Sequence, residues 1–263
     1  LLAYRLKYVY MSMHGGTATI HNRLVRSSTF DLVSAALGNL CGRGLDFTVN
    51  TVVAKQNVEH LRSVVDAVLS HPDVVLKFSM VQPKGRGAEH FEVLAVPVAI
   101  VAERVCDAIR YGTERRGHRE GPRFAHDGIP LCLLPGHEDL YDDLKTHRFA
   151  TMVEIGEADF FPVDDKAKIQ TERCKGCALR GPCPGLYAGY YEDFGDAELR
   201  PVAGLPRSNS FDYVFETIVT DQANGVCPLL EDGVTPWDRG RHLFVKNGER
   251  IGRFRAMSRN RWC

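Results

Sequence analysis

The sequence predicts an α/β fold built on a parallel sheet, and two observations lead to this expectation. Strand-like runs rich in β-branched and aromatic residues alternate with helical patterns along residues 1–112. Each strand and its helix together take roughly 30 to 40 residues, enough for a right-handed crossover to a parallel neighbour. A doubly wound sheet and a (β/α) barrel both fit this alternation, and in both the functional edge lies at the carboxyl ends of the strands.

The three expected strands are residues 5–13, 47–54 and 74–81. Gly15 and Gly16 end the first strand, and Pro83 closes the third. The residues that the strand ends bring to the functional edge are Ser12, Met13, His14, Asn50, Thr51, Met80, Val81 and Gln82. A binding site at this edge and ordinary capping of the strand ends explain these residues equally well.

Three helices are expected to follow these strands, over residues 28–41, 57–70 and 97–111. Apolar residues recur at helical spacing in the first two, which Ser28 or Thr29 and Asn57 can cap. Pro97 stands in the first turn of the third helix, where its missing N–H group costs little.

Composition excludes several classes of protein. The 33 basic and 33 acidic side chains cancel, so no net charge attracts the chain to nucleic acid or to a membrane. No apolar run approaches the roughly 20 residues that a membrane-spanning helix needs. We therefore expect a cytoplasmic protein without a membrane or nucleic-acid partner. Because the chain opens directly on a strand without an initiator Met, we also expect an N-terminal portion to be missing.

The pattern changes after the third helix. Residues 113–127 are polar, basic and Gly-containing, which favours a solvated linker over an anion-binding loop. We expect one boundary in this stretch and a second after residue 203, which gives three regions: 1–115, 116–203 and 204–263. The last region is unassigned apart from one hairpin, residues 242–246 and 249–254, joined by Asn247-Gly248 in a type I′ turn.

Three of the eight cysteines, Cys174, Cys177 and Cys183, lie within ten residues and carry the strongest chemical signal. In a reducing cytosol such spacing indicates a metal site more often than disulfides, and soft thiolates select zinc or an iron–sulfur cluster. The basic neighbours that would lower the thiol pKa values are Arg173, Lys175 and Arg180. Three thiolates leave a fourth coordination position. Cys132 can fill it, with Cys227 as the second candidate, or the position stays open on an iron.

At this point the sequence resembles a family. The segment CKGCALRGPCPGLYAGYYEDFGDAELRP resembles the C-x2-C-x5-C part of the SPASM and twitch auxiliary-cluster domains of radical S-adenosylmethionine enzymes. Upstream, YVYMSMHGGTATIHN, GLDFTVNTVVAKQNVEHL and KFSMVQPKGRG resemble the fourth to sixth strands of the radical S-adenosylmethionine barrel. The likeness covers roughly residues 4–202.

The resemblance implies the C-terminal part of a (β/α)6 partial TIM barrel, followed by a small α+β cysteine-rich auxiliary domain. It implies a 4Fe-4S cluster on Cys174, Cys177, Cys183 and Cys132, and S-adenosyl-L-methionine as the source of a 5′-deoxyadenosyl radical that abstracts hydrogen. Ser12 and Asn50 would contact the ribose or amino-acid part of this cofactor, and Met80 and Val81 would lie near the adenine. The implied partners are a substrate peptide or small molecule and an electron donor such as flavodoxin or ferredoxin.

The sequence departs from this family in two places. It contains no C-x3-C-x2-C triplet for the radical-generating cluster, which a missing N-terminus or a loss of activity would explain. Tyr187 stands where a full SPASM pattern has a further cysteine. The alternative from another class is a zinc-stabilised, non-catalytic binding module that contacts nucleic acid through Arg115, Arg116, Arg119 and Arg123. The preceding strand–helix alternation and the neutral net charge both weigh against that alternative. A metallohydrolase site at His14 and His21 is weaker still, because no acidic partner has a suitable spacing.

Overall fold

The structure is a computed structural model that describes residues 8–43, 45–117, 121–142, 151–152, 161–162, 168–180, 183–204, 242–246 and 249–254. The chain divides into two compact units, residues 1–129 and 130–263. None of the helices in these described ranges is long and apolar enough to cross a membrane.

The first unit is built on a parallel four-stranded sheet, which confirms the predicted α/β class. Its strands are β1 (Tyr8–Ser12), β2 (Asp46–Val53), β3 (Val74–Met80) and β4 (Arg123–Asp127), in the order β1-β2-β3-β4. Each strand lies beside the one that precedes it along the chain. Right-handed crossovers that all step in one direction place their helices on one face of the sheet.

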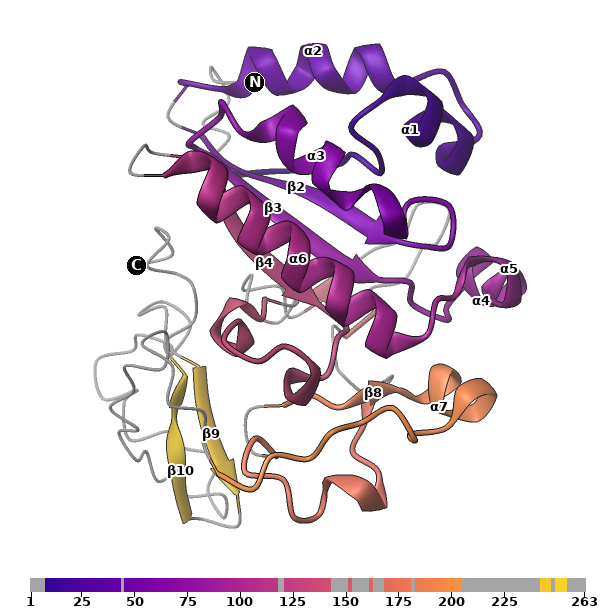
Figure 1. Ribbon diagram of the computed structural model, residues 1–263, viewed down its shortest axis with the longest axis vertical. Helices are drawn as coiled ribbons and strands as arrows, with labels where there is room; N and C mark the ends of the chain where they lie inside the picture. Colours follow the sequence, from indigo (N-terminus) through magenta and orange to yellow (C-terminus); the bar gives the residue numbers. More distant parts are fainter. Residues whose placement is uncertain are drawn as a thin grey trace. The chain divides into compact units, whose positions relative to one another are not determined.

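Among the described residues, three helices of this unit begin close to the predicted starts at residues 28, 57 and 97, and three further helices were not predicted. They are α1 (Ala18–Val25), α2 (Phe30–Leu40), the short η2 (Val58–His60) with α3 (Leu61–Val68), and then α4 (Arg86–Glu89), α5 (Phe91–Leu94) and α6 (Val98–Arg116). Thr29 precedes α2, and Pro97 precedes α6. Asn57 precedes η2, but its side chain accepts the N–H of Ala54 and donates to the carbonyl of Val52 instead of capping the helix. Figure 1 shows α3 and α6 lying across the sheet.

One face of the sheet is apolar and carries the core of the first unit. Phe124 of β4 and Val65 of α3 meet at Gly112 of α6, where an added Cβ would clash with both side chains. Because side chains alternate along a strand, the residues that share this helix-covered face follow from the register. They include the buried Phe47, Val49, Val53, Val74, Leu76, Phe78 and Met80.

The opposite face of the sheet, called here the polar face, has a different composition. Its residues are Tyr10, Ser12, Thr48, Asn50, Val52, Val75, Lys77, Ser79, Arg123, Ala125 and Asp127. Thr48, Asn50, Lys77 and Ser79 are buried, whereas Tyr10 and Ser12 on β1 are exposed. Hydrogen-bonding side chains are therefore concentrated on the side of the sheet that faces away from α3 and α6.

The predicted solvated linker at residues 113–127 is wrong. Residues 113–116 continue α6, and Arg123–Asp127 form β4, whose Phe124, Ala125 and His126 are buried. The first unit extends to Ile129, beyond the boundary expected after residue 115. The strand was missed because its alternate residues belong to the polar face, so it lacks an apolar run.

The second unit is described as short elements. They are η3 (Leu131–Leu133), η4 (Glu138–Leu140), the paired β5 (Thr151–Met152) and β6 (Phe161–Pro162), the paired β7 (Lys168–Ile169) and β8 (Leu186–Tyr187), η6 (Glu172–Cys174) and α7 (Ala188–Phe194). The antiparallel β9 (His242–Lys246) and β10 (Glu249–Phe254) confirm the predicted hairpin strands, whereas the turn at Asn247-Gly248 lies outside the described residues. A small buried cluster of Leu131, Tyr141 and Leu179 packs against Cys177, Cys183 and Val202.

Candidate functional site

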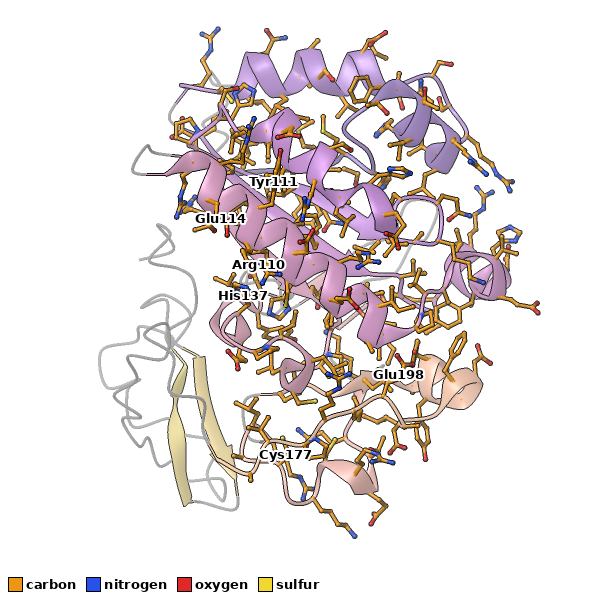
Figure 2. The ribbon with its side chains drawn as sticks, in the orientation of Figure 1. Arg110, Tyr111, Glu114, His137, Cys177 and Glu198 are labelled. Atoms are coloured by element: carbon orange, nitrogen blue, oxygen red, sulfur yellow. The ribbon has the colours of Figure 1, made fainter. Side chains whose placement is uncertain are left out.

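Four cysteines of the second unit line one small cavity. Cys132 comes from η3, Cys174 ends η6, and Cys177 and Cys183 follow in the loop before β8. Figure 2 marks Cys177 in this unit. The cavity volume is about 10 Å³, close to the room that one water molecule or one metal ion needs. The structure thus brings Cys132, the first candidate for a fourth ligand, to the other three, whereas Cys227 lies outside the described residues.

Backbone hydrogen bonds hold the cysteine loop in its turns. The N–H of Cys177 donates to the carbonyl of Cys174 at 3.1 Å, and the N–H of Cys183 donates to that of Leu179 at 2.9 Å. Gly185 follows with φ of 94°, and a Cβ there would collide with the carbonyl of Ile169 on β7. Glycine at this position therefore lets the loop lie close against the β7–β8 pair.

The sulfur atoms accept hydrogen bonds from the backbone. The N–H of Leu131 lies 3.4 Å from Sγ of Cys183, and the N–H of Val202 lies 3.4 Å from Sγ of Cys177. Sulfur is a weak acceptor as a thiol, and hydrogen bonds of this kind stabilise the thiolate. Similar bonds to the sulfur atoms are one of the means by which proteins tune iron–sulfur clusters.

Burial opposes ionisation of the same groups. Desolvation raises the pKa of Cys183 to about 12, although backbone hydrogen bonds from Leu131 and Gly185 act in the other direction. Desolvation also raises the pKa of Cys132, which a backbone hydrogen bond from Arg200 partly offsets. Without a nearby cation these thiols stay protonated at neutral pH, and a bound metal ion supplies the positive charge that thiolates need.

The basic neighbours of the cysteines have partners of their own. Lys175 pairs with Glu172 at 2.5 Å, and Arg173 lies 3.7 Å from Asp196. Arg180 lines the cavity, and its Nε donates to the side-chain oxygen of Gln170 at 3.1 Å. Of the three predicted cations, Arg180 therefore lies at the cavity itself.

The donor set fits a metal centre of thiolate ligands. Soft sulfur ligands in a set of four are typical of structural zinc and of iron–sulfur clusters. As placed in the described parts of the chain, no three Cys, His, Asp or Glu side chains are drawn together closely enough to hold a metal ion. The assignment therefore rests on the shared cavity and the backbone donors around it.

The cofactor-binding residues implied by the resemblance lie in the first unit and divide between the two faces of its sheet. Ser12 and Asn50 are paired neighbours on the polar face, and Ser79 Oγ donates to Asn50 Oδ1 at 2.7 Å. The side chain of Met80 lies on the helix-covered face with 3% exposure, and Val81 is buried just after the strand. The sheet thus brings Ser12 and Asn50 together but directs the Met80 side chain away from them.

Sequence reasoning missed Lys77, which lies next to Asn50 on the polar face. Its side chain is 1% exposed, and its Nζ lies 3.8 Å from Oδ2 of Asp127 on β4. The signal in the sequence was a single lysine inside the otherwise apolar strand VVLKFSM, a position where a charge is costly unless it has a partner.

His14 and His21 have structural roles. The N–H of Val52 donates to Nδ1 of His14 at 3.1 Å, and the N–H of His14 donates to Nδ1 of His21 at 3.1 Å. Both rings therefore carry their proton on Nε2 and have no lone pair left for a metal. Burial, followed by the charge of His21, lowers the pKa of His14 to about 4, so this ring is neutral near pH 7.

The arginines considered for nucleic-acid binding do not share one element. Arg115 lies in the last turn of α6, near Asp66 and over the ring of Tyr111, which Figure 2 labels on this helix. Arg116 donates to the carbonyl of Pro122, and Arg123 belongs to β4. Arg119 lies outside the described residues.

Comparisons with known proteins leave the chain without an assigned family. No family model matches the sequence, and no curated protein or solved structure matches it.

Proposed function

We propose that the chain is part of a radical S-adenosylmethionine enzyme and that its second unit holds an auxiliary 4Fe-4S cluster on Cys132, Cys174, Cys177 and Cys183. The observation that carries the proposal is that all four cysteines line one cavity. Cys132 was the first of several candidates for the fourth position in the sequence, and it reaches this cavity from a separate element, η3.

The sheet of the first unit supports the same proposal. A doubly wound sheet reverses its strand order at a switch point and carries helices on both faces. The order β1-β2-β3-β4, with α3 and α6 across one face, is compatible with the winding of a (β/α) barrel and supports the proposal. In a partial TIM barrel the polar face, with Ser12 and Asn50, would line the interior and bind the cofactor.

In this proposal the two units have different tasks. S-adenosylmethionine would supply the 5′-deoxyadenosyl radical, and the auxiliary cluster would serve in electron transfer or in anchoring the substrate. The chain's own residues exclude water around buried thiols and orient the sulfurs through the N–H groups of Leu131 and Val202. Because the sequence contains no C-x3-C-x2-C triplet, the proposal assigns no ligand of the radical-generating cluster to this chain.

A zinc-stabilised, non-catalytic binding module is the second candidate. The observation that favours it is the cavity volume of about 10 Å³, which accommodates one ion more readily than four irons and four sulfides. Four thiolates around one zinc ion form a closed structural site, which would hold the loops of the second unit together.

The test is the metal and acid-labile sulfide content of protein purified without oxygen, together with its visible spectrum. We expect iron and sulfide in equal amounts and broad visible absorption, both lost in C132A and in the C174A/C177A/C183A variant. The matched control is C106A, because Cys106 lies on α6 in the first unit.

Two results would decide against the proposal. Zinc without sulfide in a colourless protein would replace it with the zinc-stabilised module. Iron and sulfide that survive in C132A would keep the cluster but remove Cys132 from its ligands.

A further inference from the structure

The polar face contains a buried cation whose hydrogen-bonding capacity is unused. The Lys77 side chain is 1% exposed, and its Nζ makes no hydrogen bond with the described parts of the chain. Oδ2 of Asp127 lies 3.8 Å away, beyond hydrogen-bond distance, and the ring of Tyr10 is centred 5.9 Å away. The amine of a lysine can donate several hydrogen bonds, and among the described residues no acceptor lies within hydrogen-bond distance of this one.

A charge in this state is costly. Burying an ammonium group is unfavourable unless oppositely charged groups and hydrogen-bond acceptors compensate it, and one carboxylate at 3.8 Å does so only in part. An oxyanion that reaches Nζ would supply both the missing acceptors and the negative charge. The position is therefore prepared for an anionic group that the chain itself does not provide.

The neighbouring strand adds a second donor. Asn50 lies beside Lys77 in the register, and its Oδ1 accepts a hydrogen bond from Ser79 Oγ at 2.7 Å. This bond orients the amide of Asn50 and leaves its Nδ2 group as a donor on the same face. Asn50 and Lys77 stand opposite each other on adjacent strands, so their donors lie on the same face and can approach the two oxygens of one carboxylate.

Access to these donors lies on the side of β1. Tyr10, whose ring lies over the Lys77 amine, is 41% exposed, and Ser12 is exposed on the same strand. A rotation of the Tyr10 side chain would open the amine to a small molecule. The ring would then flank the bound ligand.

We propose that the polar face binds the carboxylate of a small organic acid, held by Lys77 Nζ and Asn50 Nδ2. This acid is a ligand separate from S-adenosylmethionine, so the proposal assigns Asn50 to the acid in place of the cofactor contact that the resemblance implies and leaves Ser12 to the cofactor. The inference concerns the first unit alone and does not depend on the cysteine site. Its test uses no iron, so a failure of this inference and a failure of the proposed function are distinguishable.

The experiment is calorimetric titration of the full chain with succinate at constant ionic strength. We expect saturable binding that weakens at least ten-fold in K77M/D127N, a pair of substitutions that removes both charges of the Lys77–Asp127 pair. The matched control D127N retains Lys77 and is expected to bind succinate at least as tightly as the wild type. A second control, K55M, removes a lysine that donates to the Glu92 carbonyl outside the polar face.

A second variant covers the case in which K77M/D127N fails to fold. N50D keeps the shape of the side chain but replaces the donor with a negative charge, and it should also weaken succinate binding at least ten-fold. Absence of saturable binding by the wild type, or equal binding by the folded variants, would overturn the proposal. Competition between succinate and S-adenosylhomocysteine would assign the carboxylate to the cofactor and would overturn it as well.

Discussion

The two units of the chain differ in what holds them together. In the first unit a four-stranded sheet buries one apolar face beneath α3 and α6, and residues from Phe47 to Phe124 contribute to its core. In the described part of the second unit, strands are short, and Leu131, Tyr141 and Leu179 form a buried cluster with two thiols packed against it. Further buried apolar side chains of the second unit include Leu134, Leu186 and Tyr190, so apolar burial contributes to both units, over a continuous sheet in the first and between short elements in the second.

Magnitudes make this difference concrete. Fully burying a large apolar side chain contributes roughly 1.5–3 kcal/mol, so the three residues of this cluster together contribute less than about 10 kcal/mol. A structural metal on cysteine ligands contributes on the order of 10 kcal/mol. A metal bound as proposed would therefore add a contribution comparable with that of this cluster.

The largest effect should follow from removing the centre. In the C174A/C177A/C183A variant we expect the second unit to lose order, because a metal bound as proposed would contribute on the order of 10 kcal/mol to its folding. Limited proteolysis with mass spectrometry should show cleavage within residues 130–204 at least ten-fold faster than in the wild type. A fragment close to residues 1–129 should persist in both digests.

The control for this digest is C106A, which should be cleaved like the wild type. Equal resistance of the second unit in the wild type and the triple variant would show that its order does not depend on the cysteines.

An intermediate effect is expected in the core of the first unit. Phe78 on β3 is fully buried on the helix-covered face, so F78A should lower the free energy of unfolding by about 3–5 kcal/mol. Urea unfolding followed by circular dichroism measures this change. The matched substitution L32A, at a side chain with 70% exposure on α2, should stay within about 0.5 kcal/mol of the wild type. Similar losses in both variants would contradict the assignment of the apolar face as the core.

The smallest effect concerns pH and the first unit. The pKa of His14 is about 4 in the folded chain and 6.5 in the unfolded chain, so between these values the unfolded state binds the extra proton. The contribution of His14 to the free energy of unfolding is therefore complete above pH 6.5, and about 3 kcal/mol of it is lost as the pH drops to 4.

H14N isolates this contribution. The Asn oxygen can accept the N–H of Val52 as Nδ1 of His14 does, but it does not titrate. Urea unfolding at pH 4.5 and 7 should show a smaller pH-dependent loss in H14N than in the wild type. An identical loss in both proteins would assign the acid sensitivity to other groups.

Apolar periodicity predicted much of the first unit. Strands β1 to β3 and helices α2 and α6 lie where the patterns placed them, and in β2, β3 and α6 the apolar pattern corresponds to a row of buried side chains. Strand β4 was not predicted, because Arg123 and Asp127 project to the polar face and few of the five residues of this strand are apolar. The burial of Lys77 was not predicted either, because a sequence does not show that a lysine side chain is buried without hydrogen-bond acceptors.

The cysteine site was predicted in part. Spacing alone identified Cys174, Cys177 and Cys183, because a short C-x2-C loop aims two thiols in one direction. Cys132 was one of several candidates, and only the fold places η3 beside the same cavity. Hydrogen bonds to the sulfurs come from backbone groups such as Val202 N–H. Because nearly every residue type has a backbone N–H group, the sequence does not reveal these bonds.

The wide separation of the site's parts has a consequence for synthesis of the chain. Leu131 donates to Cys183, which lies 52 positions further along, and Cys132 follows Leu131 directly. At about 5–20 residues per second, a ribosome needs roughly 3–10 seconds to add that many residues. For this interval Cys132 has been made but its partners have not. The nascent chain therefore passes through a period in which an unpaired thiol is exposed to oxidants and to the wrong metal ion.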